Sequence, residues 1–178
     1  MTICINLYSG PGVGKSTLAA SLFAELKKSQ IECELITEFA KRKVWEGNTT
    51  CLTNQLYITA KQQYMMWCVS QHVNVIVTDS PLLLGCIYGN DDLLNQIILR
   101  EHYKFDNIDL FLTRNPKVEY QPSGRNQTLC ESMELDTKIR GMLETVNPNF
   151  ITITTETPMS ELVSLVKSRI ASTSCQIS

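Results

Sequence analysis

The sequence predicts one three-layer α/β domain, in which a parallel sheet of five strands lies between two layers of helices. Short apolar runs alternate with longer segments of helical periodicity about five times along the chain. Strands joined by helices run parallel, and the connecting helices cover both faces of the sheet. The second observation is size, because 178 residues suit one globular domain and would be cramped for two.

The predicted strands are short apolar or β-branched runs that end at turn residues or charged residues. They cover residues 3–8, 33–37, 73–78, 108–113 and 150–154. Helical spacing of apolar residues predicts helices over 15–29, 38–45, 54–71, 91–102, 128–146 and 160–170. In the helix over 54–71, one side carries Leu56, Ala60, Tyr64 and Trp67. We expect a single domain over residues 1–171 and a frayed tail over 172–178.

Composition and charge exclude several classes of protein. With 43% apolar residues the chain is not a disordered one, and a net charge of −2 gives no global attraction to nucleic acid or membranes. The seven cysteines include no C-x-x-C pair, which argues against zinc and thiol-redox sites and favours small buried side chains in a reducing cytoplasm. There is no apolar run of about 20 residues and no signal-peptide pattern. We therefore expect a soluble cytoplasmic protein that does not bind membranes (host cytoplasm if viral).

The loop after the first predicted strand carries the strongest chemical signal. Its sequence, Ser9-Gly-Pro-Gly-Val-Gly-Lys-Ser-Thr17, matches the phosphate-binding pattern G-x-x-x-x-G-K-[ST] except that Ser9 replaces the first glycine. Glycines let successive N–H groups converge on phosphate oxygens, and the helix that follows directs its N-terminal dipole at them. The sequence therefore predicts a P-loop NTPase fold that binds ATP and Mg²⁺. The predicted ATP-binding residues are Ser9, Gly10, Pro11, Gly12, Val13, Gly14, Lys15, Ser16 and Thr17.

Within this loop two side chains have distinct expected roles. Lys15 supplies positive charge to the β- and γ-phosphates, so we count it as catalytic, and Ser16 is placed to coordinate Mg²⁺.

Two carboxylates follow predicted strands, at the edge where ligands bind in open α/β sheets. Asp79 follows the strand over 73–78 and is the expected second metal ligand and a catalytic residue, although aspartate is also a good helix N-cap. Glu38 follows the second strand and is the expected base for an acceptor hydroxyl, although glutamate also suits the first turn of a helix.

Further residues are candidates for the acceptor side. Arg42 and Trp45 lie four and seven residues after Glu38, so we expect them on the same helical face, with the indole stacking a base or lying in the core. The basic run 41–43 is either a solvated helix face or a contact for a phosphate backbone.

The polar segment near 115–127 is the expected lid loop, since it contains two prolines, a glycine and an arginine. Phosphoryl transfer needs positive charge on the transferring group. Arg125 is the first candidate for this cation. Arg114, which also counts as an acceptor-binding candidate, is the second, and Arg140 is a third.

Four segments together resemble small phage-type P-loop kinases of the thymidylate-kinase-like group. They are Ser9–Thr17, Thr37-Glu-Phe-Ala-Lys41, Thr78-Asp-Ser-Pro81 and Ser123-Gly-Arg-Asn-Gln127. In similar deoxynucleoside and nicotinamide-riboside kinases a glutamate after strand two handles the acceptor hydroxyl, which matches Glu38. Thymidylate kinases usually carry Asp-Arg after strand three, and the Ser80 found here departs from that pattern.

The resemblance is strongest to the branch that phosphorylates 5-hydroxymethyluracil in phage DNA. It implies an ATP-dependent phosphotransferase whose partner is a nucleotide-like acceptor, such as DNA containing that modified base. The alternatives left open are a kinase of free deoxynucleosides or deoxynucleotides and a P-loop NTPase switch. The chain lacks the Asn-Lys-x-Asp guanine reader of GTPases. The oligomeric state is not determined, and a homodimer stays open.

Overall fold

A computed structural model describes residues 1–89, 91–115 and 128–175 of the chain. Its strands form one parallel sheet in the order β2-β3-β1-β4-β5. The strands are β1 (Ile3–Tyr8), β2 (Cys33–Ile36), β3 (Val75–Thr78), β4 (Asp106–Leu112) and β5 (Ile151–Ile153). The predicted α/β class and five-stranded parallel sheet are therefore confirmed.

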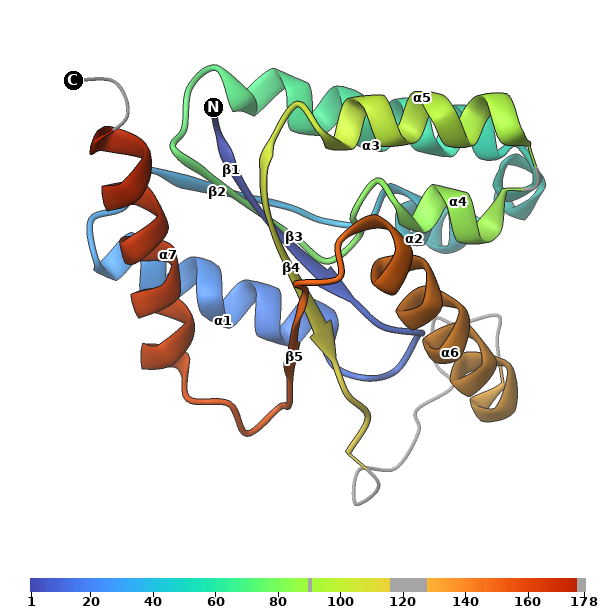
Figure 1. Cartoon of the computed structure of the whole chain (residues 1–178). Coiled ribbons are helices and arrows are strands. Elements are labelled where there is room, and N and C mark those ends of the chain that lie inside the picture. Colours follow the sequence, from blue (N-terminus) through green and yellow to red (C-terminus); the bar gives the residue numbers. More distant parts are fainter. Residues whose placement is uncertain (90, 116–127, 176–178) are drawn as a thin grey trace.

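Helices cover both faces of this sheet (Figure 1). On one face lie α1 (Lys15–Lys28) and α7 (Met159–Cys175), which contact each other. On the other face lie α3 (Gln55–Ser70), α4 (Leu84–Tyr88), α5 (Asp92–His102) and α6 (Leu129–Val146). The short α2 (Phe39–Trp45) and the 3₁₀ turn η1 (Thr49–Thr53) connect β2 to α3.

The central strand β1 shows how the sheet separates two hydrophobic cores. Its side chains alternate between the faces because successive residues of a strand point to opposite sides. Ile3, Ile5 and Leu7 pack in the core beneath α1 and α7. Cys4 and Tyr8 pack in the core beneath α3–α6. All of these side chains are buried, so a nearly continuous apolar run was the correct signal for a central strand.

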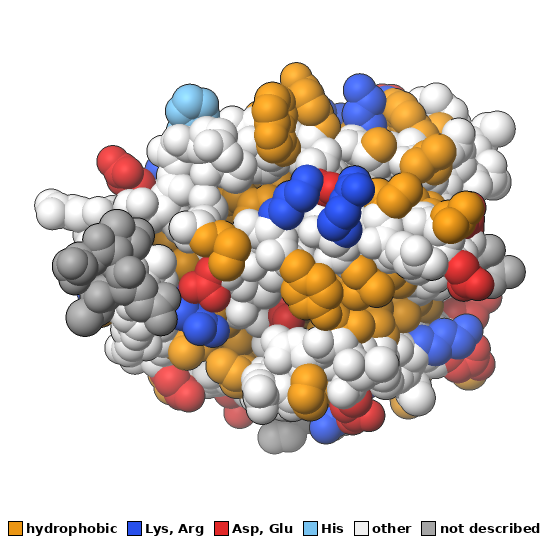
Figure 2. Space-filling model, turned by 45° about the horizontal axis from the view of Figure 1, so that its top comes forward, with side chains coloured by type: hydrophobic (Ala, Val, Ile, Leu, Met, Phe, Trp, Pro, Cys, Tyr) orange, Lys and Arg blue, Asp and Glu red, His pale blue; other side chains and the backbone are white. Residues whose placement is uncertain are grey.

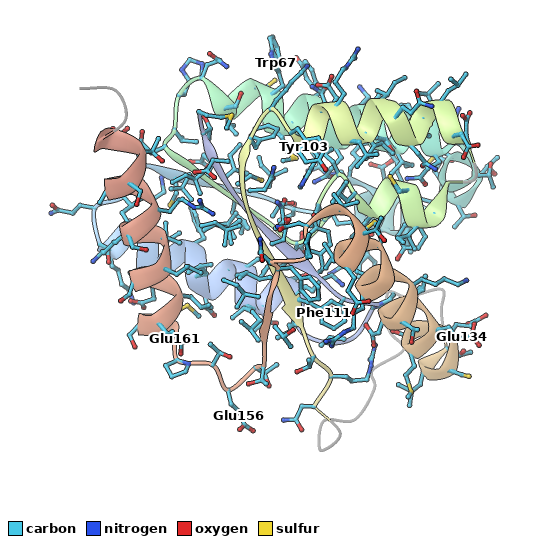
Figure 3. All side chains as sticks on the ribbon, viewed as in Figure 1. Trp67, Tyr103, Phe111, Glu134, Glu156 and Glu161 are labelled. Atoms are coloured by element: carbon cyan, nitrogen blue, oxygen red, sulfur yellow. The ribbon has the colours of Figure 1, made fainter. Side chains whose placement is uncertain are left out.

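The large apolar side chains that share one side of α3 do not face the core. Leu56, Tyr64 and Trp67 are 54–61% exposed, whereas Thr59, Gln62 and Met66 are buried. Trp67 points away from the sheet (Figure 3), and hydrophobic side chains appear among polar ones on the face that Figure 2 presents. Polar residues occupy the inner side because part of α3 faces a cavity, described below, rather than packed apolar side chains.

Other differences concern short elements, the chain end and the cysteines. The helix α4 was not predicted, because its five residues are too few to show a helical period. The helix α7 continues to Cys175, so residues 172–175 are helical, and 176–178 lie outside the described residues. Of the cysteines, Cys4 and Cys33 are buried as expected, but Cys68 and Cys130 are exposed. None of the helices within the described ranges is long and apolar enough to cross a membrane.

The start of α6 is held by a reciprocal cap. The Thr128 hydroxyl accepts a hydrogen bond from the Glu131 N–H at 3.3 Å, and the Glu131 carboxylate accepts one from the Thr128 N–H at 2.7 Å. Such a capping box satisfies two backbone donors that a helix end otherwise leaves unpaired.

We predict that Thr128→Ala lowers the free energy of unfolding by about 1 kcal/mol, as measured by urea denaturation. The matched control is Thr137→Ala in the same helix. The Thr137 hydroxyl bonds only to the Met133 carbonyl one turn earlier, so its loss should be neutral or slightly stabilising. Equal losses in the two variants would contradict the capping role.

Candidate nucleotide-binding site

The loop between β1 and α1 has the backbone shape that phosphate binding requires. Gly12 and Gly14 have positive φ angles of 84° and 104°, a region that L-residues with a Cβ rarely adopt. Gly14 is the N-cap of α1, where no side chain caps the helix and no acidic residue lies in the first turn. Within the described part of the chain, the first N–H groups of α1 are therefore left available for an anion, with the helix dipole behind them.

Lys15 curls back over this loop. Its ammonium donates hydrogen bonds to the carbonyls of Ser9 at 2.7 Å and Gly10 at 3.0 Å. Burial lowers the pKa of Lys15, while the negative charges of Glu38, Asp79 and Asp136 oppose that shift. A cation held among carbonyls and carboxylates at the phosphate end of the loop can exchange these contacts for phosphate oxygens.

The strand register brings the two predicted carboxylates to the same edge as the loop. Ile36 of β2 pairs with Thr78 of β3, and Thr78 pairs with Asn6 of β1, so β2 and β3 end together and β1 continues two residues further, to Tyr8. Asp79 is 4% exposed, and its Oδ1 is buried without a hydrogen-bond partner among the described residues. It does not cap α4, which begins only at Leu84. An orphaned buried carboxylate oxygen beside a P-loop fits a ligand that is not protein.

Mg²⁺ fits this place because it needs only a few ligands from the protein. Among the described residues, no three His, Cys, Asp or Glu side chains cluster to hold a metal by themselves. Mg²⁺ typically takes one or two protein oxygens and completes its shell with waters and substrate phosphates. Ser16 and Asp79 both line the cavity described below and would supply those oxygens.

Glu38 is presented to the cavity by the join between β2 and α2. It is the N-cap of α2, with extended φ and ψ of −61° and 117°, but its side chain makes no capping bond. Gln62 holds the backbone on both sides of it, since its Oε1 accepts from the Phe39 N–H at 3.1 Å and its Nε2 donates to the Thr37 carbonyl at 3.5 Å. Burial raises the pKa of Glu38, and Asp79 raises it further, against the lowering effect of Lys15.

These residues line one cavity of about 470 Å³ that begins at the P-loop and extends away from it. Its far part is walled by α2, η1, α3 and α4 with mostly apolar, amide and hydroxyl side chains. They are Val44, Leu52, Gln55, Ile58, Thr59, Gln62, Leu84 and Tyr88. Burial and the nearby charges of Glu38 and Asp136 raise the pKa of Tyr88 to about 12, so its hydroxyl is a neutral hydrogen-bond donor. This volume suits a small organic ligand.

The structure corrects the predicted acceptor face of α2. Lys41 and Val44 line the cavity, whereas Arg42 and Trp45 do not, and Trp45 is 68% exposed rather than in the core. The prediction counted helical spacing from Glu38, but the extended backbone of Glu38 places it outside the helix. The position of Glu38 therefore does not fix which residues of α2 face the cavity.

The candidate arginines also lie differently from the prediction. Arg114 does not line the cavity; it binds the carbonyl of Pro11 and the carboxylate of Asp136 on the outer side of the P-loop. Arg140 pairs with Glu144 and packs over the rings of Phe111 and Phe150. Phe111 lies at the end of β4 close to α6 (Figure 3). Arg125 and the predicted lid near 115–127 lie outside the described residues, apart from Asn115.

Sequence reasoning missed the cavity wall of α3 and α4 as well as Asp136. Gln55, Thr59 and Gln62 are spaced at four and three residues, which is a helical face of polar residues in an otherwise amphipathic segment. That polar face was a usable signal. Tyr88 and Asp136 have no comparable signal in the sequence, because only tertiary packing brings α4 and α6 to the site.

The fold and the loop define this chain as a P-loop nucleotide-binding protein. Within that class it belongs to the AAA domain family, whose sequence profile matches residues 4–160.

Among solved structures, the one titled "Crystal structure of APE1195" matches with a TM-score of 0.52 and 20% identity, covering 94% of this chain and 95% of that chain. The APS kinase of Mycobacterium tuberculosis, in a cysteine-to-alanine mutant, matches with a TM-score of 0.49 and 12% identity over 94% and 95% of the two chains. The first likeness shows the fold alone, and the second is too distant to support an argument. None of the curated proteins compared with this chain matches it.

The tightest requirement for glycine in the loop is at Gly10. A Cβ there would collide with the Ser132 carbonyl and lie 2.8 Å from the Ser132 Oγ, so α6 or the loop would have to move. We predict that Gly10→Ala weakens binding of an ATP analogue by at least about 10-fold, measured by calorimetry. The control is Gly141→Ala in α6, where a Cβ meets nothing within 4 Å. Unchanged affinity in Gly10→Ala would show that the loop tolerates displacement.

Proposed function

We propose that this protein is an ATP-dependent phosphotransferase that moves the γ-phosphate to a hydroxyl group of a nucleotide-like acceptor. One observation carries the proposal: a partly buried carboxylate, Glu38, lines the same cavity as the P-loop lysine, and that cavity continues into a compartment walled by α2, η1, α3 and α4. An NTPase switch needs the phosphate site but has no use for a substrate-sized compartment beyond it. A kinase needs both.

The residues divide the reaction between them. The P-loop amides and Lys15 hold the β- and γ-phosphates, and Mg²⁺ bound through Ser16 and Asp79 would neutralise phosphate charge. Glu38 accepts the proton of the acceptor hydroxyl as its oxygen forms the new bond to the γ-phosphorus. The bond from that phosphorus to the β,γ-bridging oxygen breaks, and ADP leaves with the electron pair.

The raised pKa of Glu38 supports this role. A carboxylate that is poorly solvated is a stronger base than one in water. The positive charge of Lys15 has the largest lowering effect on the pKa of Glu38 and partly offsets the effect of burial. Gln62 fixes its backbone from both sides, so the base is held in place rather than on a free loop.

For the acceptor we propose 5-hydroxymethyluracil in DNA, with a free deoxynucleoside or deoxynucleotide as the alternative. The resemblance of Thr37–Lys41 and Thr78–Pro81 to phage DNA-base kinases supports the first. Lys41 at the cavity and its exposed neighbour Arg42 offer positive charge for a phosphate backbone. The compartment beyond Glu38 supports the alternative, a free deoxynucleoside or deoxynucleotide. Such a molecule could enter directly, whereas a base in duplex DNA would first have to leave the base stack.

We predict that Glu38→Gln leaves affinity for an ATP analogue nearly unchanged and lowers turnover by about 100-fold. The wild-type rate should fall at low pH, because protonated Glu38 cannot accept a proton. The acid limb should lie above the ordinary glutamate pKa of 4.5 and vanish in the variant. Loss of ATP binding in Glu38→Gln, or an unchanged acid limb, would mean that Glu38 is structural.

The function itself is tested by transfer of labelled γ-phosphate to a panel of acceptors. The panel contains hydroxymethyluracil DNA, plain DNA, free deoxynucleosides and their monophosphates, with Lys15→Ala as the inactive control. We expect transfer to one acceptor class only, and ATP consumption that rises steeply when that acceptor is added. Slow hydrolysis that ignores every acceptor would identify a switch and refute the kinase. If DNA is the acceptor, binding should also weaken steeply with salt.

A further inference from the structure

The outer side of the P-loop is held by three side chains from other parts of the fold. Arg114 follows β4, and Ser132 and Asp136 lie one turn apart in the first half of α6. We call these three residues the outer clamp. None of them lines the cavity, and none belongs to the phosphate-binding sequence pattern.

The residues of the outer clamp form hydrogen bonds with the backbone of Gly10 and Pro11 and with one another. The Asp136 carboxylate accepts from the Gly10 N–H through Oδ1 at 2.5 Å and from Arg114 through Oδ2 at 3.0 and 2.8 Å. Arg114 also donates to the Pro11 carbonyl at 3.3 and 3.2 Å. The Ser132 hydroxyl accepts from Arg114 at 2.6 Å and donates to the Pro11 carbonyl at 2.6 Å.

These contacts satisfy the backbone where the loop would otherwise be unsupported. Pro11 has no N–H, so its carbonyl is its only polar backbone group, and the outer clamp directs donors from two side chains at it. Gly10 turns its N–H outward to Asp136. The backbone of residues 10–11 is thus fixed from outside, while the N–H groups at the start of α1 remain for phosphate. A loop held in its binding shape loses less entropy when the ligand binds.

All three nitrogens of the Arg114 guanidinium donate hydrogen bonds within the outer clamp. Its Nε, Nη1 and Nη2 all donate to the loop carbonyl, the carboxylate or the hydroxyl, and its side chain is only 19% exposed. A planar fork can make these contacts together, whereas the point charge of a lysine cannot.

We infer that Asp136 is a positioning residue for nucleotide binding, and that Arg114 works with it to hold the P-loop rather than as a cation on the acceptor or the transferring phosphate. This inference does not depend on the proposed kinase reaction, because it concerns binding of the nucleotide alone.

The test measures binding of adenylyl imidodiphosphate with Mg²⁺ by calorimetry for Asp136→Asn, Arg114→Lys and the double variant. Charge-assisted hydrogen bonds of this kind predict about a 10-fold or greater loss of affinity in each single variant. Because the two residues act as one unit, the double variant should lose little more than either single one. Catalysis needs no measurement here, so failure of the kinase proposal would leave the result interpretable.

The matched control is Glu144→Gln, which breaks the exposed ion pair with Arg140 on the same helix. It should bind the analogue as the wild type does. Unfolding midpoints of the ligand-free variants show whether each is folded, and Ser132→Ala is the milder substitute if Asp136→Asn does not fold. A positioning role requires weaker analogue binding by a folded variant.

Two results would overturn the inference. One is wild-type affinity in folded Asp136→Asn. The other is wild-type affinity in folded Arg114→Lys, because a lysine cannot reproduce the contacts of the planar guanidinium.

Discussion

The architecture of the site depends on one constraint: a loop that binds phosphate must leave its N–H groups unpaired on one side while the rest of its backbone is satisfied. Buried unpaired backbone groups are costly, so the fold has to provide partners for the outer side of the loop. β1 supplies a buried strand beneath the loop, α1 supplies the helix N-terminus, and α6 closes the outer side through Asp136 and Ser132. The carbonyls of Ser9 and Gly10 meanwhile hold Lys15. Removing any one of these supports would leave polar backbone without a partner.

The same sheet edge gathers the negative charges. Parallel strands end at the same level, so Glu38 and Asp79 follow β2 and β3 beside the P-loop. Burial of like charges is unfavourable, and this is expressed in the raised pKa of Glu38. Lys15 offsets part of that cost from across the cavity. An incoming metal with its triphosphate would meet the carboxylate of Asp79, whose Oδ1 has no hydrogen-bond partner among the described residues.

Much of the fold and part of the candidate site could be predicted from short segments of the sequence. The P-loop pattern, the two carboxylates after strands and the five strands depend on local sequence, and the five-stranded parallel sheet is confirmed. The errors arose where the prediction assumed continuity. Helical spacing was counted from Glu38, although its extended backbone lies outside the helix; Lys41 and Val44, rather than Arg42 and Trp45, line the cavity. In α3, Leu56, Tyr64 and Trp67 are exposed, and polar residues face inward because a cavity lies there.

By itself the sequence determined the α/β class, the P-loop and the residue types at the ends of its strands, because strand periodicity and glycine-rich turns are local properties of the chain. Only the tertiary structure decided what Arg114 contacts, that α6 supports the P-loop, and that α3 and α4 enclose a compartment beside Glu38. The first two of these features join segments separated by more than 100 positions in the chain, such as Gly10 and Asp136. No local pattern encodes such a contact, because it exists only after the sheet has brought the strand ends and the helices together.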